Sequence, residues 1–414
     1  MDTVKAQPGL DAVAQLHGSD AWDAPTSNVQ KDKSLRHLAV FGATVLILFA
    51  LVSGFNLYIF KVIAAPSNQR ILQNNVGWER SYKPILFDEL KPKVAVFGAS
   101  WARDAFDYEE MSKFFGREFF NFAASGAQPY ENLRFLQSAL AAGTLDTVIL
   151  NLDSFSAYQR RPPTQYGFNE DILSVKPDGS LNTLKAWHRL FAKTLSGAAI
   201  ASNISSLKLM GEAQKGRPKE ELLRAYDRAD YKALGAAIVE YKRQREQGRF
   251  PPVPMRLASA QALAEQSNYL GHLRSALAAA CQSGVTTVGY LTPHHGLTLH
   301  QEPKNEMLLA RKLAILAVMQ EAKKHCQGKL SFFDFYYPNQ VTLEGIRSSV
   351  DRAQWYRSDL HPRPSIGRAM AQTMFYPTQN QDEFGVDLLA LTDLAAEAWI
   401  RDRFERWFLG GRPN

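Results

Sequence analysis

The sequence predicts an α/β fold, a doubly wound and mainly parallel sheet, preceded by one transmembrane helix. From about residue 91 onward, short apolar runs alternate with segments of helical periodicity, which is the pattern of strand–helix–strand units. A single long uncharged run lies ahead of them. The mean hydropathy of −0.26 excludes a polytopic transporter, and 21% charged with 11% aromatic residues excludes a disordered chain.

The uncharged run extends from Leu38 to Phe60 and has one strongly polar member, Asn56. At a rise of about 1.5 Å per residue it measures about 35 Å, enough to cross a hydrocarbon core of about 30 Å. A cleaved signal peptide is the alternative, because Ala64-Ala65 resembles a cleavage site. The apolar region of a signal peptide is usually shorter, which favours the transmembrane helix.

Basic residues predict how the chain is oriented in the membrane. Lys31, Lys33 and Arg36 precede the apolar run and only Lys61 follows it closely, which places the N-terminus in the cytoplasm. The predicted organisation is therefore a disordered cytoplasmic tail (1–37), the membrane helix (38–60), a linker (61–90) and an exported α/β domain (91–414). Outside the cytoplasm, the net charge of +7 no longer suggests a nucleic-acid partner.

Five strands and four helices are predicted in the exported domain. The strands are apolar runs bounded by turn residues or helices: Val94–Phe97, Phe119–Phe122, Thr147–Leu152, Val285–Leu291 and Leu330–Phe335. The helices are Tyr108–Phe115, Asn132–Ala142, Ser267–Cys281 and Glu306–His325. Residues 160–262 interrupt the alternation, and we predict a mainly helical insertion there.

Candidate functional residues follow three of these strands. In a doubly wound sheet, ligands bind outside the carboxyl ends of the parallel strands, which is where these residues are expected. Ser100 comes after the first strand, where a helix cap is the alternative to a nucleophile. Gly126 lies in the loop after the second strand and can present a backbone N–H, or form an ordinary turn. Asn151 and Asp153 end the third strand, with a turn or an N-cap as the alternative.

A fourth candidate lies far downstream, in Ser358-Asp359-Leu360-His361. A histidine and an aspartate this close can share one loop, where the histidine takes a proton from a serine and the carboxylate orients the ring. Taken singly, an ordinary surface histidine is the simpler interpretation.

The order of these four blocks resembles the SGNH (GDSL-type) hydrolase superfamily. The resemblance covers residues 91–155 and 285–414, and it is closest to membrane-anchored bacterial proteins related to the alginate O-acetylation group. The segments that carry it are VFGASWARDAF, FNFAASGAQPYENLRFL, VILNLDSFSAY, YLTPHHG and SDLHPRPSIG. It implies an SGNH-like, flavodoxin-like sheet in the periplasm, anchored by one span in the bacterial inner membrane.

The resemblance also implies roles for the candidate residues. Ser100 would be the nucleophile, His361 the general base and Asp359 its orienting acid, while Ser100, Gly126 and either Asn151 or Asp153 would form the oxyanion hole. The third block departs from the pattern, because Asp153 falls where an Asn would donate and an ionised carboxylate has no proton to donate. Either Asn151 supplies that donor, or Asp153 is protonated, or the site does not catalyse.

Ala99 and Ser358 depart from the pattern as well, because the superfamily usually has Asp at both positions. Asp359 is therefore two residues before His361 rather than three. This Asp-x-His spacing occurs in the acetylation relatives.

Three further features have alternatives that the sequence leaves open. Arg103 either binds an anionic group of a substrate or forms a salt bridge with a nearby Asp. The cluster of His294, His295 and His300 suits a substrate-lining role better than a zinc site, because acidic partners at metal-ligand spacing are absent. Cys281 and Cys326 either pair in an oxidising periplasm or remain two buried thiols.

These observations predict an acyltransferase or esterase that uses Ser100 on a cell-envelope or exported polysaccharide. It would need no cofactor and no metal, and a transferase would need a membrane-bound acyl-donor protein as a partner. The alternative is a non-catalytic SGNH-fold module that binds sugar or partner proteins in a polysaccharide assembly complex.

Overall fold

The computed structural model of the 414-residue chain describes residues 27–64, 79–155, 163–165, 167–195, 260–297, 305–344, 354–356, 361–376 and 384–408, with a few isolated helical residues between 200 and 243. The chain divides into two units, Met1–Val52 and Ser53–Asn414. Residues 1–26 of the predicted disordered tail (1–37) lie outside the described residues, whereas residues 27–37 are helical because the helix of the apolar run begins at Ser27.

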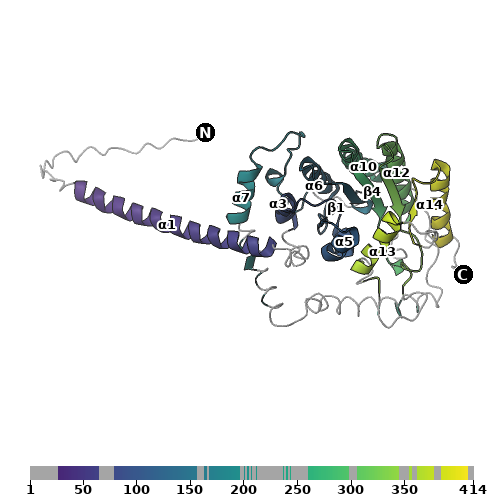
Figure 1. The fold of residues 1–414 in the computed structure, drawn as a ribbon, viewed down its shortest axis with the longest axis horizontal. Coiled ribbons are helices and arrows are strands. Elements are labelled where there is room, and N and C mark those ends of the chain that lie inside the picture. Colours follow the sequence, from purple (N-terminus) through teal and green to yellow (C-terminus); the bar gives the residue numbers. More distant parts are fainter. Residues whose placement is uncertain are drawn as a thin grey trace, which may run out of the picture. The chain divides into compact units, whose positions relative to one another are not determined.

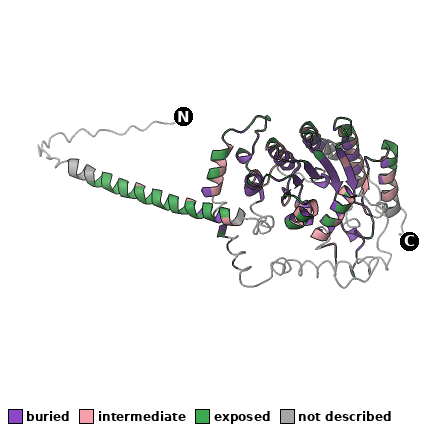
Figure 2. Cartoon of the chain, in the orientation of Figure 1, coloured by how far each residue is buried: buried purple, intermediate pink, exposed green. Residues whose placement is uncertain are grey.

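Helix α1, Ser27–Ala64, contains the apolar run predicted from the sequence. Its stretch from Lys33 to Val62 is long and apolar enough to cross a membrane, and its large apolar side chains are exposed along most of that length, as Figure 2 shows. A single membrane span and a signal sequence both fit such a helix at this position.

The second unit contains a six-stranded sheet in the order β2-β1-β3-β4-β5-β6 (Figure 1). The strands are Val94–Phe97 (β1), Phe119–Asn121 (β2), Thr147–Asn151 (β3), Thr286–Leu291 (β4), Leu330–Asp334 (β5) and Val386–Asp387 (β6). The first five are parallel and β6 is antiparallel to β5. The order 2-1-3-4-5 is that of a flavodoxin-like doubly wound sheet, which confirms the predicted α/β class.

Helices cover both faces of the sheet because successive strand residues point to opposite sides. In β1, Ala95 and Phe97 join one apolar cluster and Val94 and Val96 join the other. The first cluster packs against α3 (Glu79–Leu90), α6 (Pro129–Ala141), α10 (Ala260–Gln282), α12 (Asn305–Lys323) and α14 (Asp393–Phe408). The second packs against α4 (Ser100–Ala105), α5 (Tyr108–Phe115) and α13 (Pro364–Phe375).

Two stretches differ from the expectation drawn from the sequence. Part of the predicted linker, 61–90, forms α3, which buries Tyr82, Ile85, Leu86 and Phe87 in the core. Its apolar pattern is masked by Pro84 and by three buried charged residues, of which Glu79 and Arg80 form ion pairs and Lys83 donates to a backbone carbonyl. Within the predicted insertion, the described elements are the short η3 (Glu170–Ile172) and α7 (Lys185–Thr194).

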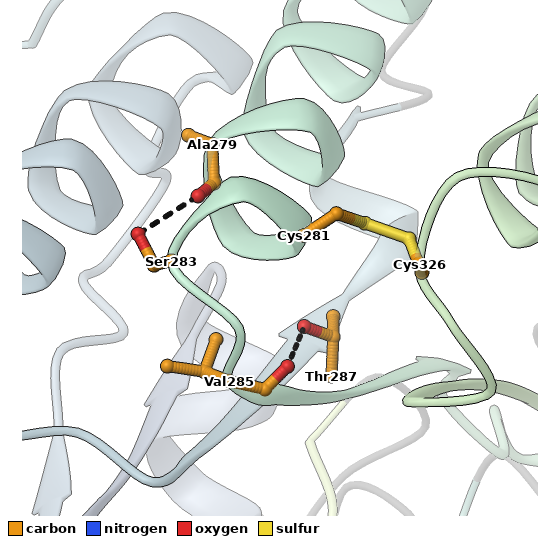
Figure 3. Close-up of a disulfide and its surroundings, with 6 residues drawn as sticks. All are labelled: Ala279, Cys281, Ser283, Val285, Thr287 and Cys326. Carbon is orange, nitrogen blue, oxygen red and sulfur yellow. Dashed lines mark hydrogen bonds between the residues drawn. A yellow bond between two sulfur atoms is a disulfide. The ribbon is translucent and has the colours of Figure 1, made fainter.

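A disulfide joins the end of α10 to the turn after α12 (Figure 3). Cys281 and Cys326 are bonded across a sequence separation of 45 residues. Their Cα atoms lie 4.8 Å apart, within the range that a disulfide accommodates. Of the two alternatives that the sequence left open, the structure shows the bond, which suits an oxidising compartment.

We expect the purified full-length protein to contain no free thiol until it is reduced. Counting thiols with a chromogenic reagent in denaturant should give zero for protein kept from reductant and two after reduction, because the chain has two cysteines. Two reactive thiols in protein isolated from its native compartment without reductant would contradict the disulfide.

Candidate active site

The candidate site lies where the strand order reverses, between β1 and β3. In doubly wound sheets, ligands bind outside the carboxyl ends of the strands at this reversal. Ser100 begins α4 directly after β1, and Asn151 is the last residue of β3. The fold therefore brings the first and third sequence blocks to one edge of the sheet.

Gly98 makes this approach possible because it has no side chain. A Cβ on Gly98 would lie 2.5 Å from the Cβ of Asn151 and 2.9 Å from that of Ala102, so no other residue fits without moving them. The carbonyl of Gly98 accepts a hydrogen bond from the Ala124 N–H at 3.1 Å. The second block, which contains Gly126, is thereby joined to the first.

Ser100 is the first residue of α4 and does not cap it. The N-cap is Ala99, and no side chain caps the helix. Ser100 is half-buried, and among the described residues neither its hydroxyl nor its N–H has a hydrogen-bond partner. Capping, the simplest structural alternative for this serine, is therefore excluded.

Gly126 adopts a left-handed conformation with φ of 62°, which favours glycine. Its carbonyl accepts a hydrogen bond from Gln128 Nε2 at 2.7 Å. Its N–H has no partner in the part of the chain that the structure describes. The N–H groups of Ser100 and Gly126 therefore remain available to a bound oxyanion.

The side chains of Asn151 and Asp153 are occupied with each other and with Thr292, the residue after β4. Asn151 Nδ2 donates to Asp153 Oδ2 at 3.1 Å and to Thr292 Oγ1 at 2.7 Å. Asp153 Oδ2 also accepts from the Thr292 N–H at 2.6 Å. Because both amide hydrogens of Asn151 are used, Asn151 does not donate to an oxyanion in this arrangement.

The two histidines after β4 have different surroundings. The ring of His294 lies 4.7 Å from Trp101 and 4.6 Å from Tyr336, so it contacts the residue next to Ser100. His295 is fully buried, with Nε2 at 2.9 Å from the Glu344 carbonyl and Nδ1 accepting from the Leu297 N–H. His295 therefore links two loops, and substrate contact remains a prediction for both histidines.

The predicted base, His361, is half-buried just before α13, whereas Asp359 and Ser358 lie outside the described residues. The helix α13 packs so closely on α4 that a Cβ on Gly367 would lie 1.8 Å from the carbonyl oxygen of Ala105. The loop that contains His361 thus leads into the helix that supports α4. The expected hydrogen bond between Ser100 and His361 is not formed, since the hydroxyl of Ser100 has no partner among the described residues.

Arg103 forms a salt bridge with a nearby carboxylate, as one of the two alternatives predicted. Its Nε donates to Asp104 at 2.8 Å and its Nη1 to Glu79 at 2.9 Å, and it also donates to the Ser125 hydroxyl. Burial alone would lower the pKa of Arg103, but the carboxylates of Asp104 and Glu79 outweigh burial and raise this pKa above its ordinary value. Its role in substrate binding stays a prediction.

A network of buried charges from α3, which the sequence did not predict, supports the Gly126 loop. Glu79 accepts from the Ser125 N–H at 2.7 Å, and Arg80 donates to the Ser125 carbonyl at 2.8 Å and to Glu131 at 2.7 Å. Lys83 donates to the Ala123 carbonyl, and burial lowers the pKa of Lys83 to about 8. The only signal in the sequence was three charged residues immediately before Ile85-Leu86-Phe87, a pattern that a solvated surface also shows.

No group of three His, Cys, Asp or Glu side chains suited to a metal ion occurs among the described residues. His300, the third member of the histidine cluster, lies outside them.

No protein-family profile matches the sequence, and no curated protein is significantly similar to it.

Proposed function

We propose that this protein is a membrane-anchored acyltransferase or esterase of the SGNH type, which acts on a cell-envelope or exported polysaccharide through Ser100. The observation that carries the proposal is the position of Ser100 at the switch point of the sheet, half-buried and uncapped, while its own N–H and that of Gly126 have no partner among the described residues. Acyl transfer needs a serine hydroxyl and backbone donors for the oxyanion that develops.

In the proposed reaction, Ser100 Oγ attacks the carbonyl carbon of an ester while His361 takes the hydroxyl proton. The N–H groups of Ser100 and Gly126 stabilise the negative charge that develops on the carbonyl oxygen. The tetrahedral intermediate collapses to an acyl-serine as His361 returns the proton to the leaving alcohol. A sugar hydroxyl or a water then attacks the acyl-serine, with His361 again accepting and returning the proton.

The remaining parts of the proposal rest on α1 and on the sequence resemblance. We infer that α1 is a retained span of a bacterial inner membrane, with the N-terminus in the cytoplasm and the α/β domain in the periplasm. The resemblance to proteins of alginate O-acetylation supports an acetyl group and a polysaccharide. If the protein is a transferase, a membrane-bound partner would deliver the acyl group.

A second candidate function is a non-catalytic module of a polysaccharide assembly complex. One observation favours it: Asn151 gives both amide hydrogens to Asp153 and Thr292, so Asn151 offers no donor to an oxyanion. Such a module would keep the fold and bind sugar or partner proteins at the same edge of the sheet.

A fluorophosphonate probe separates the two candidates, because only an activated serine reacts with it. For the full-length protein in detergent micelles, we expect one adduct, mapped by peptide mass spectrometry to the peptide that contains Ser100. The neighbouring Ser125, whose hydroxyl accepts from Arg103, should remain unlabelled. Folded protein that takes up no probe would favour the non-catalytic module.

A further inference from the structure

Helix α7 exposes an apolar face. Leu184, which caps α7, is 57% exposed, Trp187 is 72% exposed, Leu190 is 44% exposed and Phe191 is 60% exposed. Residues three and four apart lie on one side of a helix, so these side chains form one stripe. A stripe of large exposed apolar residues indicates a surface that meets another apolar phase.

The basic side chains of α7 turn toward the protein instead. Arg189 pairs with Asp88 of α3 and donates to the Ile172 carbonyl at 2.7 Å. Lys185 lies 3.4 Å from Asp88, and Lys193 pairs with Glu89 at 2.5 Å. The polar side of the helix is therefore fixed to the domain by ion pairs, which leaves the apolar side facing outward.

The C-terminal end of α7 is attached to the last turns of α1. Asn56 Nδ2 donates to the Thr194 carbonyl at 2.7 Å, and Asn203 Nδ2 donates to Asn56 Oδ1 at 2.7 Å. Asn56 is fully buried, which explains a strongly polar residue within the apolar run. It lies four residues before Phe60, so its contacts are about 6 Å along the helix axis from the end of the run.

Side chains of the two helices also line one cavity. Leu57 of α1 and Leu190 of α7 line one cavity of about 350 Å³. The ammonium group of Lys193 lies 4.2 Å from the centre of the Phe60 ring, at the end of the apolar run. One residue of the exposed face of α7, Leu190, therefore borders the same cavity as the last turns of α1.

We propose that α7 is an interfacial helix whose apolar face, Leu184, Trp187, Leu190 and Phe191, lies in the boundary between lipid headgroups and acyl chains beside the membrane span. The inference rests on the part of the proposed function that makes α1 a retained span. Trp and large aliphatic side chains favour this boundary. Contact at α7 in addition to the span fixes the orientation of the domain on the membrane surface, which a single span with a flexible linker does not.

The test measures the depth of spin labels in the full chain reconstituted into phosphatidylglycerol-containing vesicles. Trp187→Cys and Phe191→Cys variants are labelled with a nitroxide and compared for relaxation by lipid-soluble oxygen and by a water-soluble nickel chelate. Leu394→Cys on α14 is the matched control, because Leu394 is an apolar side chain that is 82% exposed. Val45→Cys reports on the span, and the unsubstituted protein must take up no label.

We expect the ratio of oxygen to nickel accessibility at 187 and 191 to exceed that at 394 several-fold and to approach that at 45. A label at 187 that is accessible to nickel while the label at 45 is not would overturn the interfacial helix and leave the span intact. Protection of 187 from both relaxants would show a protein contact and overturn it too. Nickel accessibility at 45 would instead contradict the span itself, and with it the anchor of the proposed function.

Discussion

Replacing Lys312 with Met is expected to lower the free energy of unfolding by about 4 kcal/mol, because it leaves a buried carboxylate without its partner. Lys312 of α12 and Asp334 of β5 are 5% and 1% exposed. The ammonium group lies 3.0 Å and 2.8 Å from the two carboxylate oxygens and also donates to the Tyr336 carbonyl. The measurement is chemical unfolding of the full chain in detergent micelles.

The matched control removes the orphaned charge as well. The double variant Lys312→Met with Asp334→Asn should recover a large part of the loss, because a neutral amide is less costly to bury than an unpaired carboxylate. If the double variant is as unstable as the single one, lost packing rather than an unpaired charge is responsible.

The destabilisation should also depend on pH in a defined direction. Burial raises the pKa of Asp334 above its ordinary value of 3.8, although Lys312 opposes this. Without Lys312 the folded pKa rises further, so the carboxyl binds its proton more tightly in the folded state than in the unfolded state. The loss of unfolding free energy in the Lys312→Met variant is then smallest below pH 3.8. It grows as the pH rises through the pKa that Asp334 has in the folded state. A loss that is the same at pH 4.5 and pH 8 would contradict this account.

The same ion pair bears on the candidate site. Lys312 and Asp334 both bond to the backbone of Tyr336, whose ring contacts His294, which in turn contacts Trp101 beside Ser100. The pair is therefore connected to Trp101, the residue next to Ser100, through Tyr336 and His294.

The sequence predicted β1 to β5 and the helices α5, α6, α10 and α12 well, because apolar runs bounded by turn residues have few alternative structures. It did not predict β6, α13 or α14. The predicted and observed bounds coincide for Val94–Phe97 and Tyr108–Phe115. It did not predict α3, because buried charges such as Glu79 and Lys83 look like surface residues until their partners from distant segments are known.

The limits of prediction are similar at α7 and at the candidate site. Periodicity shows that α7 has two faces, but not that the basic face packs on the domain, because that depends on Asp88 and Glu89 of α3. The pattern of strand ends predicted that the first and third blocks meet, and Gly98 of the first block packs against Asn151 of the third. The direction in which the Asn151 amide donates depends on Thr292, 141 residues away, and no local pattern encodes it.

Hydrolysis of an aryl acetate by the Ser100→Ala variant tests the central claim most directly. An alanine has no nucleophile, so the acyl-serine cannot form, and removal of a catalytic serine costs about a thousand-fold in rate or more. Ser275→Ala, which changes an exposed serine of α10, is the control, and it should keep a rate close to that of the unsubstituted protein. We predict that Ser100→Ala in otherwise folded, detergent-solubilised full chain loses the activity; a rate equal to that of the unsubstituted protein would contradict the assignment of Ser100 as the nucleophile.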